Sequence, residues 1–268
     1  MFSSWPVAKQ RSSKPPLWLL SLEGRALWER AARPLLQPLL GAATKGDGHT
    51  VLVLPGLLAS DGSTAVLRRY LSRLGYCVSG WDLGRNFGPK DGVIEQIAER
   101  LASLRQASGR RVSLVGWSLG GIYARELARV APKAVRCVVT LGSPLYGHPL
   151  RTTNTWTVYR AVSGRSSIRP GDRGDCPPPV PTTSILSLSD GIVGWRASIE
   201  QVSDSTENIV VRGASHLGLP YHPAVLHAIA DRLAQAENQW VPFVPTGLAR
   251  AFYGAVAAPG IAGSQEYA

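Results

Sequence analysis

Short apolar runs alternate with segments of helical periodicity along most of the chain from Thr50 onward. The apolar runs predict buried strands, and the intervening segments, with apolar residues three or four positions apart, predict amphipathic helices. This alternation is typical of a mostly parallel sheet of about six strands with helices on both faces, an α/β fold. Strands are predicted at 51–54, 76–81, 111–115, 135–141, 183–188 and 209–211, and helices at 63–74, 92–105, 119–130 and 224–234.

Both ends of the chain lack this alternation, so three parts are predicted: an extension (1–47), a main domain (48–236) and a tail (237–268). Within the main domain, residues 144–181 are rich in Gly, Pro, Arg and Thr and form a cap-like insertion. Only residues 154–162 of this insertion have a helical pattern.

The extension carries apolar residues at helical spacing between 17 and 40, which predicts one or two amphipathic helices interrupted by Pro34 and Pro38. Two interpretations stay open. Either the apolar face packs on the main domain, or it lies on an anionic membrane surface with Arg25, Arg30 and Arg33 near the headgroups.

Composition narrows the class of protein. With 268 residues, 44% of them hydrophobic, the chain can bury one large core. The formal charge of +11 permits contact with nucleic acid or anionic membrane, but no nucleic-acid motif accompanies it. Three cysteines without metal-type spacing favour a reducing compartment, and no apolar run is long enough to span a membrane. We therefore expect a cytoplasmic protein, or a peripheral membrane protein, without metal or cofactor.

The most informative motif is Gly116-Trp117-Ser118-Leu119-Gly120, a G-x-S-x-G sequence between a predicted strand and a predicted helix. At such a sharp turn the glycines let the strand and helix backbones approach each other. The turn would raise the Ser118 hydroxyl above the carboxyl edge of the sheet, next to a helix N-terminus that favours negative charge.

In this motif and three further segments the sequence resembles the α/β-hydrolase superfamily, in particular its bacterial serine esterases and lipases. The resemblance covers roughly residues 48–236. The first further segment, residues 51–57, looks like the family's strand and oxyanion loop, with Pro55 where many lipases have His. The resemblance implies that the backbone N–H groups of Leu57 and Leu119 form the oxyanion hole.

The other two segments supply an acid and a base in the chain order of this fold: Ser118, Asp190, His216. Asp190 lies in an Asp-Gly turn after the fifth strand, and His216 follows the sixth. Other residues are alternative candidates for these roles. His222 is the alternative base and Asp204 the alternative acid, and Ser143 could contact the substrate. Less favoured candidates are His148 and His227 for the base, and Asp82, Asp172 and Asp175 for the acid.

A serine hydroxyl is a poor nucleophile at neutral pH, so an imidazole must accept its proton, and a carboxylate must orient that imidazole. We therefore expect hydrolysis of a small-molecule or lipid carboxylic ester through an acyl-enzyme. Trp117, Trp156 and Tyr159 are the predicted substrate-binding side chains, the latter two on a short lid. Acyltransferase or thioesterase chemistry on the same triad, or a non-catalytic binding protein of this fold, are the alternatives.

Overall fold

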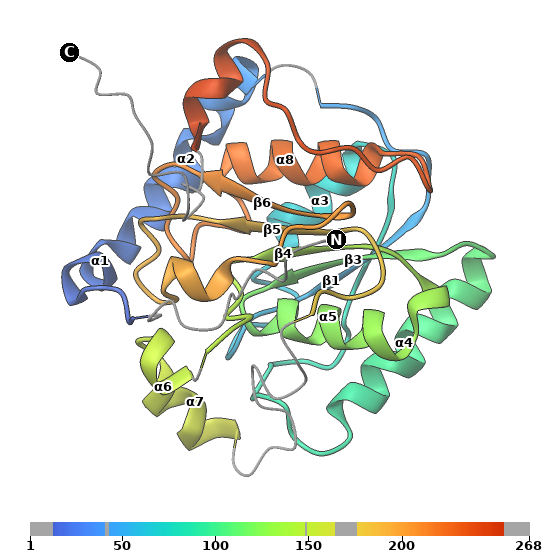
Figure 1. The fold of residues 1–268 in the computed structure, drawn as a ribbon, viewed down its shortest axis with the longest axis horizontal. Helices are drawn as coiled ribbons and strands as arrows, with labels where there is room; N and C mark the ends of the chain where they lie inside the picture. The colour runs from blue at the N-terminus through green and yellow to red at the C-terminus, as the bar shows by residue number, and fades with distance from the viewer. Residues whose placement is uncertain (1–12, 41–42, 148, 164–175, 255–268) are drawn as a thin grey trace, which may run out of the picture.

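The fold is a twisted sheet between two layers of helices (Figure 1). The computed structural model describes residues 13–40, 43–147, 149–163 and 176–254. The strand order is β2-β1-β3-β4-β5-β6-β7, and all neighbours pair in parallel except the antiparallel pair β6–β7. The strands are β1 (Thr50–Leu54), β2 (Cys77–Gly80), β3 (Val112–Trp117), β4 (Val135–Leu141), β5 (Thr182–Leu186), β6 (Thr206–Val211) and β7 (Tyr253–Gly254).

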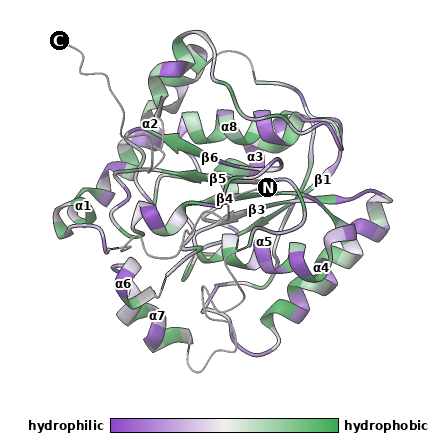
Figure 2. Ribbon diagram, viewed as in Figure 1, coloured by the Kyte–Doolittle hydropathy of each residue, from purple (hydrophilic) through white to green (hydrophobic). Residues whose placement is uncertain are grey.

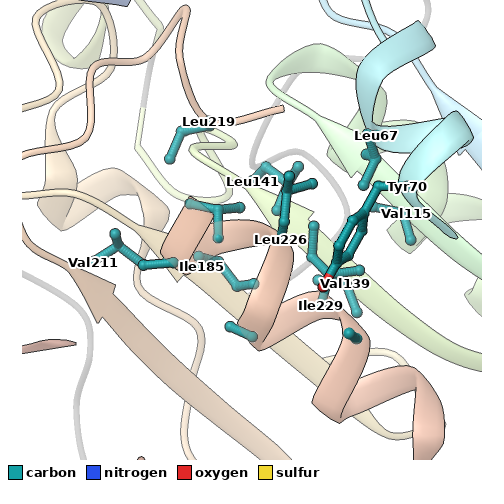
Figure 3. Packing of buried hydrophobic residues seen from close by; sticks show 14 of the residues in the cluster. Leu67, Tyr70, Val115, Val139, Leu141, Ile185, Val211, Leu219, Leu226 and Ile229 are labelled. Carbon is teal, nitrogen blue, oxygen red and sulfur yellow. The ribbon is translucent and has the colours of Figure 1, made fainter. Parts of the chain in front are cut away.

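Helices cover both faces of the sheet, so β1, β3 and β5 are buried along their whole length. On one face, α3 and α8 pack against the sheet through Leu67, Leu226 and Ile229, as Figure 3 shows. On the other face, α4 and α5 pack through Ile97, Leu101 and other apolar residues. The main-domain helices are α3 (Ala65–Arg73), α4 (Val93–Ser108), α5 (Leu119–Val130) and α8 (Pro223–Ala234).

The predicted strands and helices of the main domain are all present, with ends that differ by up to three residues. The predicted fifth strand is the clearest shortening: β5 ends at Leu186, and residues 187–190 form the loop toward Asp190. The seventh strand was not predicted, because two residues pairing at a sheet edge leave no periodic pattern.

The N-terminal segment forms α1 (Leu17–Ser21), the 3₁₀ turn η1 (Leu22–Arg25), α2 (Ala26–Leu36) and the 3₁₀ turn η2 (Gln37–Leu40). The predicted interruption at Pro34 is wrong, because α2 continues through Pro34 to Leu36. The break falls earlier, at η1, which contains Gly24. The insertion carries α6 (Pro149–Thr152) and α7 (Trp156–Ser163), the latter close to the predicted 154–162 helix.

All parallel strands end at the same edge of the sheet, and the loops after them meet there. The order β2-β1-β3 places the point where the chain reverses its direction of winding between β1 and β3. Open α/β sheets bind their ligands at such a point. The register pairs Leu54 with Gly116 and Trp117 with Leu141, so the loops after β1, β3 and β4 begin side by side.

Candidate active site

The turn between β3 and α5 holds Ser118 in a backbone conformation that few residues other than glycine adopt. Its φ is 54° and its ψ is −118°. Such a conformation costs of order 1–3 kcal/mol and persists only where the surroundings impose it. Here the surroundings are close: a Cβ on Gly116 would collide with the backbone of Gly120, and a Cβ on Gly120 with the carbonyl oxygen of Leu54.

Next to this turn lies the loop after β1, which contains Leu57. Asn86, fully buried, fixes the loop: its Nδ2 donates to the Pro55 carbonyl (2.9 Å), its backbone N–H donates to Ala59 (2.8 Å), and its carbonyl accepts from Leu58 N–H (2.7 Å). Asn86 was missed in the sequence, because nothing in the loop after β2 indicates a contact with the loop after β1.

Leu119 is the first residue of α5, where a backbone N–H has no acceptor within its own helix. The N–H of Leu119 can therefore donate a hydrogen bond to a group that lies beside Ser118. A Cβ on Gly56 would lie 3.1 Å from Ser118 Cβ, so the loop that carries Leu57 lies directly against Ser118.

Asp190 and His216 form a buried, directly hydrogen-bonded pair. The distance from His216 Nδ1 to Asp190 Oδ2 is 2.6 Å, and both side chains are almost completely buried. The other carboxylate oxygen of Asp190 accepts the backbone N–H groups of Ile192 (2.8 Å) and Val193 (2.7 Å). Because both oxygens are engaged, the carboxylate is held in one orientation toward the imidazole.

The pair lies against the backbone that carries Ser118. Trp117 Nε1 donates to the His216 carbonyl at 3.1 Å, and the Ser118 N–H donates to the Leu141 carbonyl at 2.8 Å. A Cβ on the next residue, Gly142, would lie 3.0 Å from Asp190 Oδ2 and 3.1 Å from His216 Nδ1. The structure therefore brings the three predicted triad loops together at the ends of β3, β5 and β6.

Burial lowers the pKa of His216, but the charges of Asp190 and Glu23 and the hydrogen bond that His216 donates to Asp190 outweigh it and raise the pKa above its ordinary 6.5. The imidazolium form is favoured by these carboxylates. A base that must accept a proton during nucleophilic attack benefits from this stabilisation.

The alternative candidates occupy other environments. Burial and Arg25 lower the pKa of His222 to about 4, and His227 Nδ1 lies 2.9 Å from the Tyr253 hydroxyl. Asp204 is exposed, Asp82 pairs with Arg100, and Ser143 is fully buried against Gly121. His148, Asp172 and Asp175 lie outside the described residues.

The predicted substrate-binding residues fall into two groups. Trp117 is 8% exposed and its indole is held by His216, whose ring centroid lies 6.0 Å away. Trp156 and Tyr159 stack on α7 with ring centroids 5.5 Å apart, and Tyr159 packs on the α4–α5 core that also includes Leu57 and Leu119.

Three charged side chains from the N-terminal segment contact the loops that carry Asp190 and His216. Glu23 accepts the N–H groups of Gly191 (2.8 Å), His216 (3.0 Å) and Leu217 (2.9 Å). Arg25 donates to the carbonyls of Ser189 and Ala214, and Glu29 accepts from Ser215 N–H and Oγ. These contacts were not predicted from the sequence, and the expected place of Arg25 near the headgroups is wrong, because its guanidinium is bound to the loops of Asp190 and His216.

In the described ranges, no group of three or more His, Cys, Asp or Glu side chains is arranged to hold a metal ion. Among the same residues, no helix combines the length and apolar character needed to cross a membrane.

Comparison with known proteins agrees with this architecture. The α/β hydrolase fold family matches residues 49–158, a range that includes Ser118 but neither Asp190 nor His216. A curated relative, Serine hydrolase BPHL of Mus musculus, is 30% identical over 112 residues, and the match spans 38% of each chain.

Among solved structures, Aspergillus fumigatus lipase B has a TM-score of 0.54 and 19% identity, covering 74% of this chain and 56% of that one. The monoacylglycerol lipase of Paleococcus ferrophilus has a TM-score of 0.48 and 16% identity, covering 70% of this chain and 96% of that one.

The fold is thus the α/β-hydrolase fold, with a mostly parallel seven-stranded sheet and flanking helices, and the fold-class prediction is confirmed. Residues 49–158 thus match the α/β hydrolase fold family, and over 112 residues the chain is similar to a serine hydrolase.

The environment of His216 makes a prediction about its titration. In the full chain, the pKa of the His216 imidazole should lie above 6.5, and Asp190→Asn should lower it, because the substitution removes the charge that favours the imidazolium. NMR of histidine-labelled protein across pH measures this, with His227 as an internal comparison whose pKa burial lowers. A His216 pKa below 6.5 in the unsubstituted protein would contradict the account.

Proposed function

We propose that the protein is a serine hydrolase that cleaves carboxylic esters through an acyl-enzyme, with Ser118, His216 and Asp190 as the triad. The observation that supports this most strongly is the buried Asp190–His216 hydrogen bond beside a serine in a strained strand-to-helix turn. A buried acid–imidazole pair of this kind serves to activate a neighbouring hydroxyl.

In the first step, Ser118 Oγ attacks the ester carbonyl carbon while His216 Nε2 accepts the hydroxyl proton. The tetrahedral intermediate collapses, the bond to the alcohol oxygen breaks, and His216 returns its proton to the leaving alcohol. Water then attacks the acyl carbon while His216 Nε2 accepts a proton from it. The bond to Ser118 Oγ breaks, His216 returns the proton to that oxygen, and the carboxylic acid is released. Asp190 holds the imidazole through Nδ1 and stabilises its charged form.

The N–H groups of Leu57 and Leu119 are the proposed oxyanion donors. They lie on the two loops that pack against each other around Ser118, so both can point at one carbonyl oxygen. Each donor of this kind contributes about 2.7–4 kcal/mol to lowering the barrier. Asn86 fixes the Leu57 loop and thereby its donor.

The proposed substrate is an ester with an apolar acyl group. Tyr159, which stacks on Trp156 in α7, packs against the core that includes Leu119 and against which Leu57 also packs. The names of the compared relatives, a serine hydrolase and a lipase, are in keeping with such a substrate.

Variants of the triad test this function. Ser118→Ala, His216→Ala and Asp190→Asn should each reduce hydrolysis of p-nitrophenyl esters by about 10⁴-fold, because each removes a part of one proton-transfer unit. Asp204→Asn, a matched loss of an exposed carboxylate, should leave the rate within twofold. The acid assignment is wrong if Asp204→Asn abolishes activity while Asp190→Asn retains it.

The lid hypothesis concerns substrate length. Replacing Trp156 and Tyr159 by Ser should raise KM more for p-nitrophenyl decanoate than for p-nitrophenyl acetate, since only the long chain reaches an apolar aromatic surface. Removing two aromatic contacts should cost the long ester roughly tenfold or more in kcat/KM. An equal change for both esters would exclude α7 from substrate binding.

A further inference from the structure

The N-terminal segment presents its apolar side to solvent and its charged side to the protein. Glu23, Arg25 and Glu29 contact the loops of Asp190 and His216, while most large apolar side chains point outward. We call the exposed set the outer apolar surface. It consists of Leu17, Trp18, Leu20, Leu22, Leu27, Trp28 and Leu35.

Leu19, Ala26 and Leu40 are buried, as the packing interpretation expects, but most of the large apolar side chains of the segment do not pack on the main domain. Trp28 is 78% exposed and Leu35 is 79% exposed, values typical of a side chain with no cover. On α2, Leu27, Ala31 and Leu35 follow each other at four-residue spacing, so they form one continuous stripe along the helix. Figure 2 shows apolar colour on α1 at the edge of the molecule.

Positive charge borders this stripe. Between α2 and α3 lies a cavity of about 200 Å³ whose lining includes Arg30, Arg69 and Arg73, and whose other lining residues are Pro34, Val66 and Tyr70. Arg30 and Pro34 belong to α2 and lie on the helix surface directly beside the stripe formed by Leu27, Ala31 and Leu35. The chain as a whole carries a formal charge of +11.

We propose that the outer apolar surface and this arginine cavity together form a docking surface for a bilayer that contains anionic lipid. Tryptophan and leucine insert at the boundary of headgroups and acyl chains, and arginine beside them pairs with lipid phosphate. A surface that mixes both features, on a strongly cationic chain, matches an anionic bilayer in charge and in polarity.

The position of the surface also suits a hydrolase of lipid esters. In Figure 1, α1 lies on the same side of the molecule as α6 and α7. Asn154, just before α7, donates to the carbonyls of both Pro15 and Gly191, so the N-terminal segment reaches the loop of Asp190. Docking through this segment places the proposed active site next to the bilayer.

Vesicle co-sedimentation of the full chain tests the proposal. The protein should bind vesicles of phosphatidylglycerol and phosphatidylcholine, bind phosphatidylcholine alone at least about tenfold more weakly, and be released by high salt. Leu27→Ser with Trp28→Ser should reduce the partition coefficient about tenfold or more, because the apolar area that enters the bilayer is lost. The same measurements on Ser118→Ala separate this proposal from the proposed function, since docking does not use the nucleophile.

Two control variants match these changes. Val202→Ser with Val241→Ser alters residues that are 71% and 59% exposed outside the N-terminal segment, and should leave binding unchanged. Arg30, Arg69 and Arg73 changed together to Gln should weaken binding more than the same change at Arg105, Lys133 and Lys45.

Three results would overturn the proposal. One is full-length protein that remains in the supernatant with anionic vesicles at low salt. The second is equal binding to neutral and anionic vesicles. The third is a dimer, detected by light scattering, that is lost in the double variant Leu27→Ser with Trp28→Ser. That result would mean that the surface is a contact between copies of the chain.

A second inference comes from the buried carboxylate on the inner side of the segment. We propose that Glu23 is a positioning residue for the Asp190–His216 pair, an inference that rests on the proposed function. Glu23 is 4% exposed, and its two oxygens accept N–H groups from the residue after Asp190, from His216 itself and from Leu217. One carboxylate thus joins the acid loop to the base loop.

Arg25 and Glu29, the neighbouring charged residues, contact the same loops but through different groups. Arg25 also bridges the two loops, through the carbonyls of Ser189 and Ala214. Glu29 contacts only the loop of His216, through Ser215, and forms an ion pair with Arg25 at 3.3 Å. Among the described residues, the charged groups that these contacts place near His216 are Asp190, Glu23, Arg25 and Glu29. Glu29→Gln is a matched control for Glu23→Gln.

Glu23→Gln keeps the shape of the side chain but removes its charge and replaces one acceptor oxygen by an –NH₂ group, which cannot accept. We expect kcat to fall about tenfold with little change in KM, because a charge-assisted hydrogen bond between the loops is lost. The pKa of His216, followed by NMR, should fall in Glu23→Gln and remain closer to that of the unsubstituted protein in Glu29→Gln.

The NMR result does not require hydrolysis, so it remains informative if the Ser118→Ala variant shows that the proposed function is wrong. Lower thermal stability in Glu23→Gln together with unchanged kcat and unchanged His216 pKa would mean a structural role only, and would overturn the inference. The same would follow if Glu29→Gln reproduced every effect of Glu23→Gln.

Discussion

The close approach of the loops after β1 and β3 is the constraint on which the rest of the site depends. Leu54 and Gly116 pair in the sheet, and the next turn of chain must place α5 against the Leu54 and Pro55 carbonyls. Only glycine fits at 116 and 120, and the short turn between them forces Ser118 into its positive φ. The proposed nucleophile and oxyanion donors are thereby positioned by β1 and β3, two strands that are buried along their whole length.

The proposed acid and base are held in a different way. Asp190 and His216 lie on loops several residues beyond the ends of β5 and β6, where the sheet no longer fixes the backbone. Their loops are connected to each other by the direct Asp190–His216 bond and, from outside, by Glu23 and Arg25 of the N-terminal segment. Because the inner side of that segment carries these charges, most of its large apolar side chains remain at the surface. The proposed docking surface and the support of the proposed triad are thus two faces of one segment.

Local features of the chain were predictable, and contacts between distant residues were not. The alternation of apolar runs and helical segments predicted the main-domain strands and helices. The position of the G-x-S-x-G motif between a predicted strand and a predicted helix predicted the sharp turn at Ser118. Glu23, in contrast, lies 168 residues from Gly191 and 193 from His216 in the chain, so no sequence pattern connects them. Asn86 and β7 were missed for the same reason, since each gains its role from a partner elsewhere in the fold. The exposure of Trp28 and Leu35 also could not be read from spacing, because amphipathic periodicity does not tell which side faces the protein.

The central claim is that Ser118 is a nucleophile activated by the Asp190–His216 pair. Mapping by mass spectrometry of the residue modified by a fluorophosphonate, which reacts with activated serines, tests it most directly. The account predicts a single phosphonylated peptide with the adduct on Ser118, and loss of the modification in His216→Ala although Ser118 is still present. An adduct on another serine, or labelling of Ser118 that proceeds equally fast without His216, would contradict it.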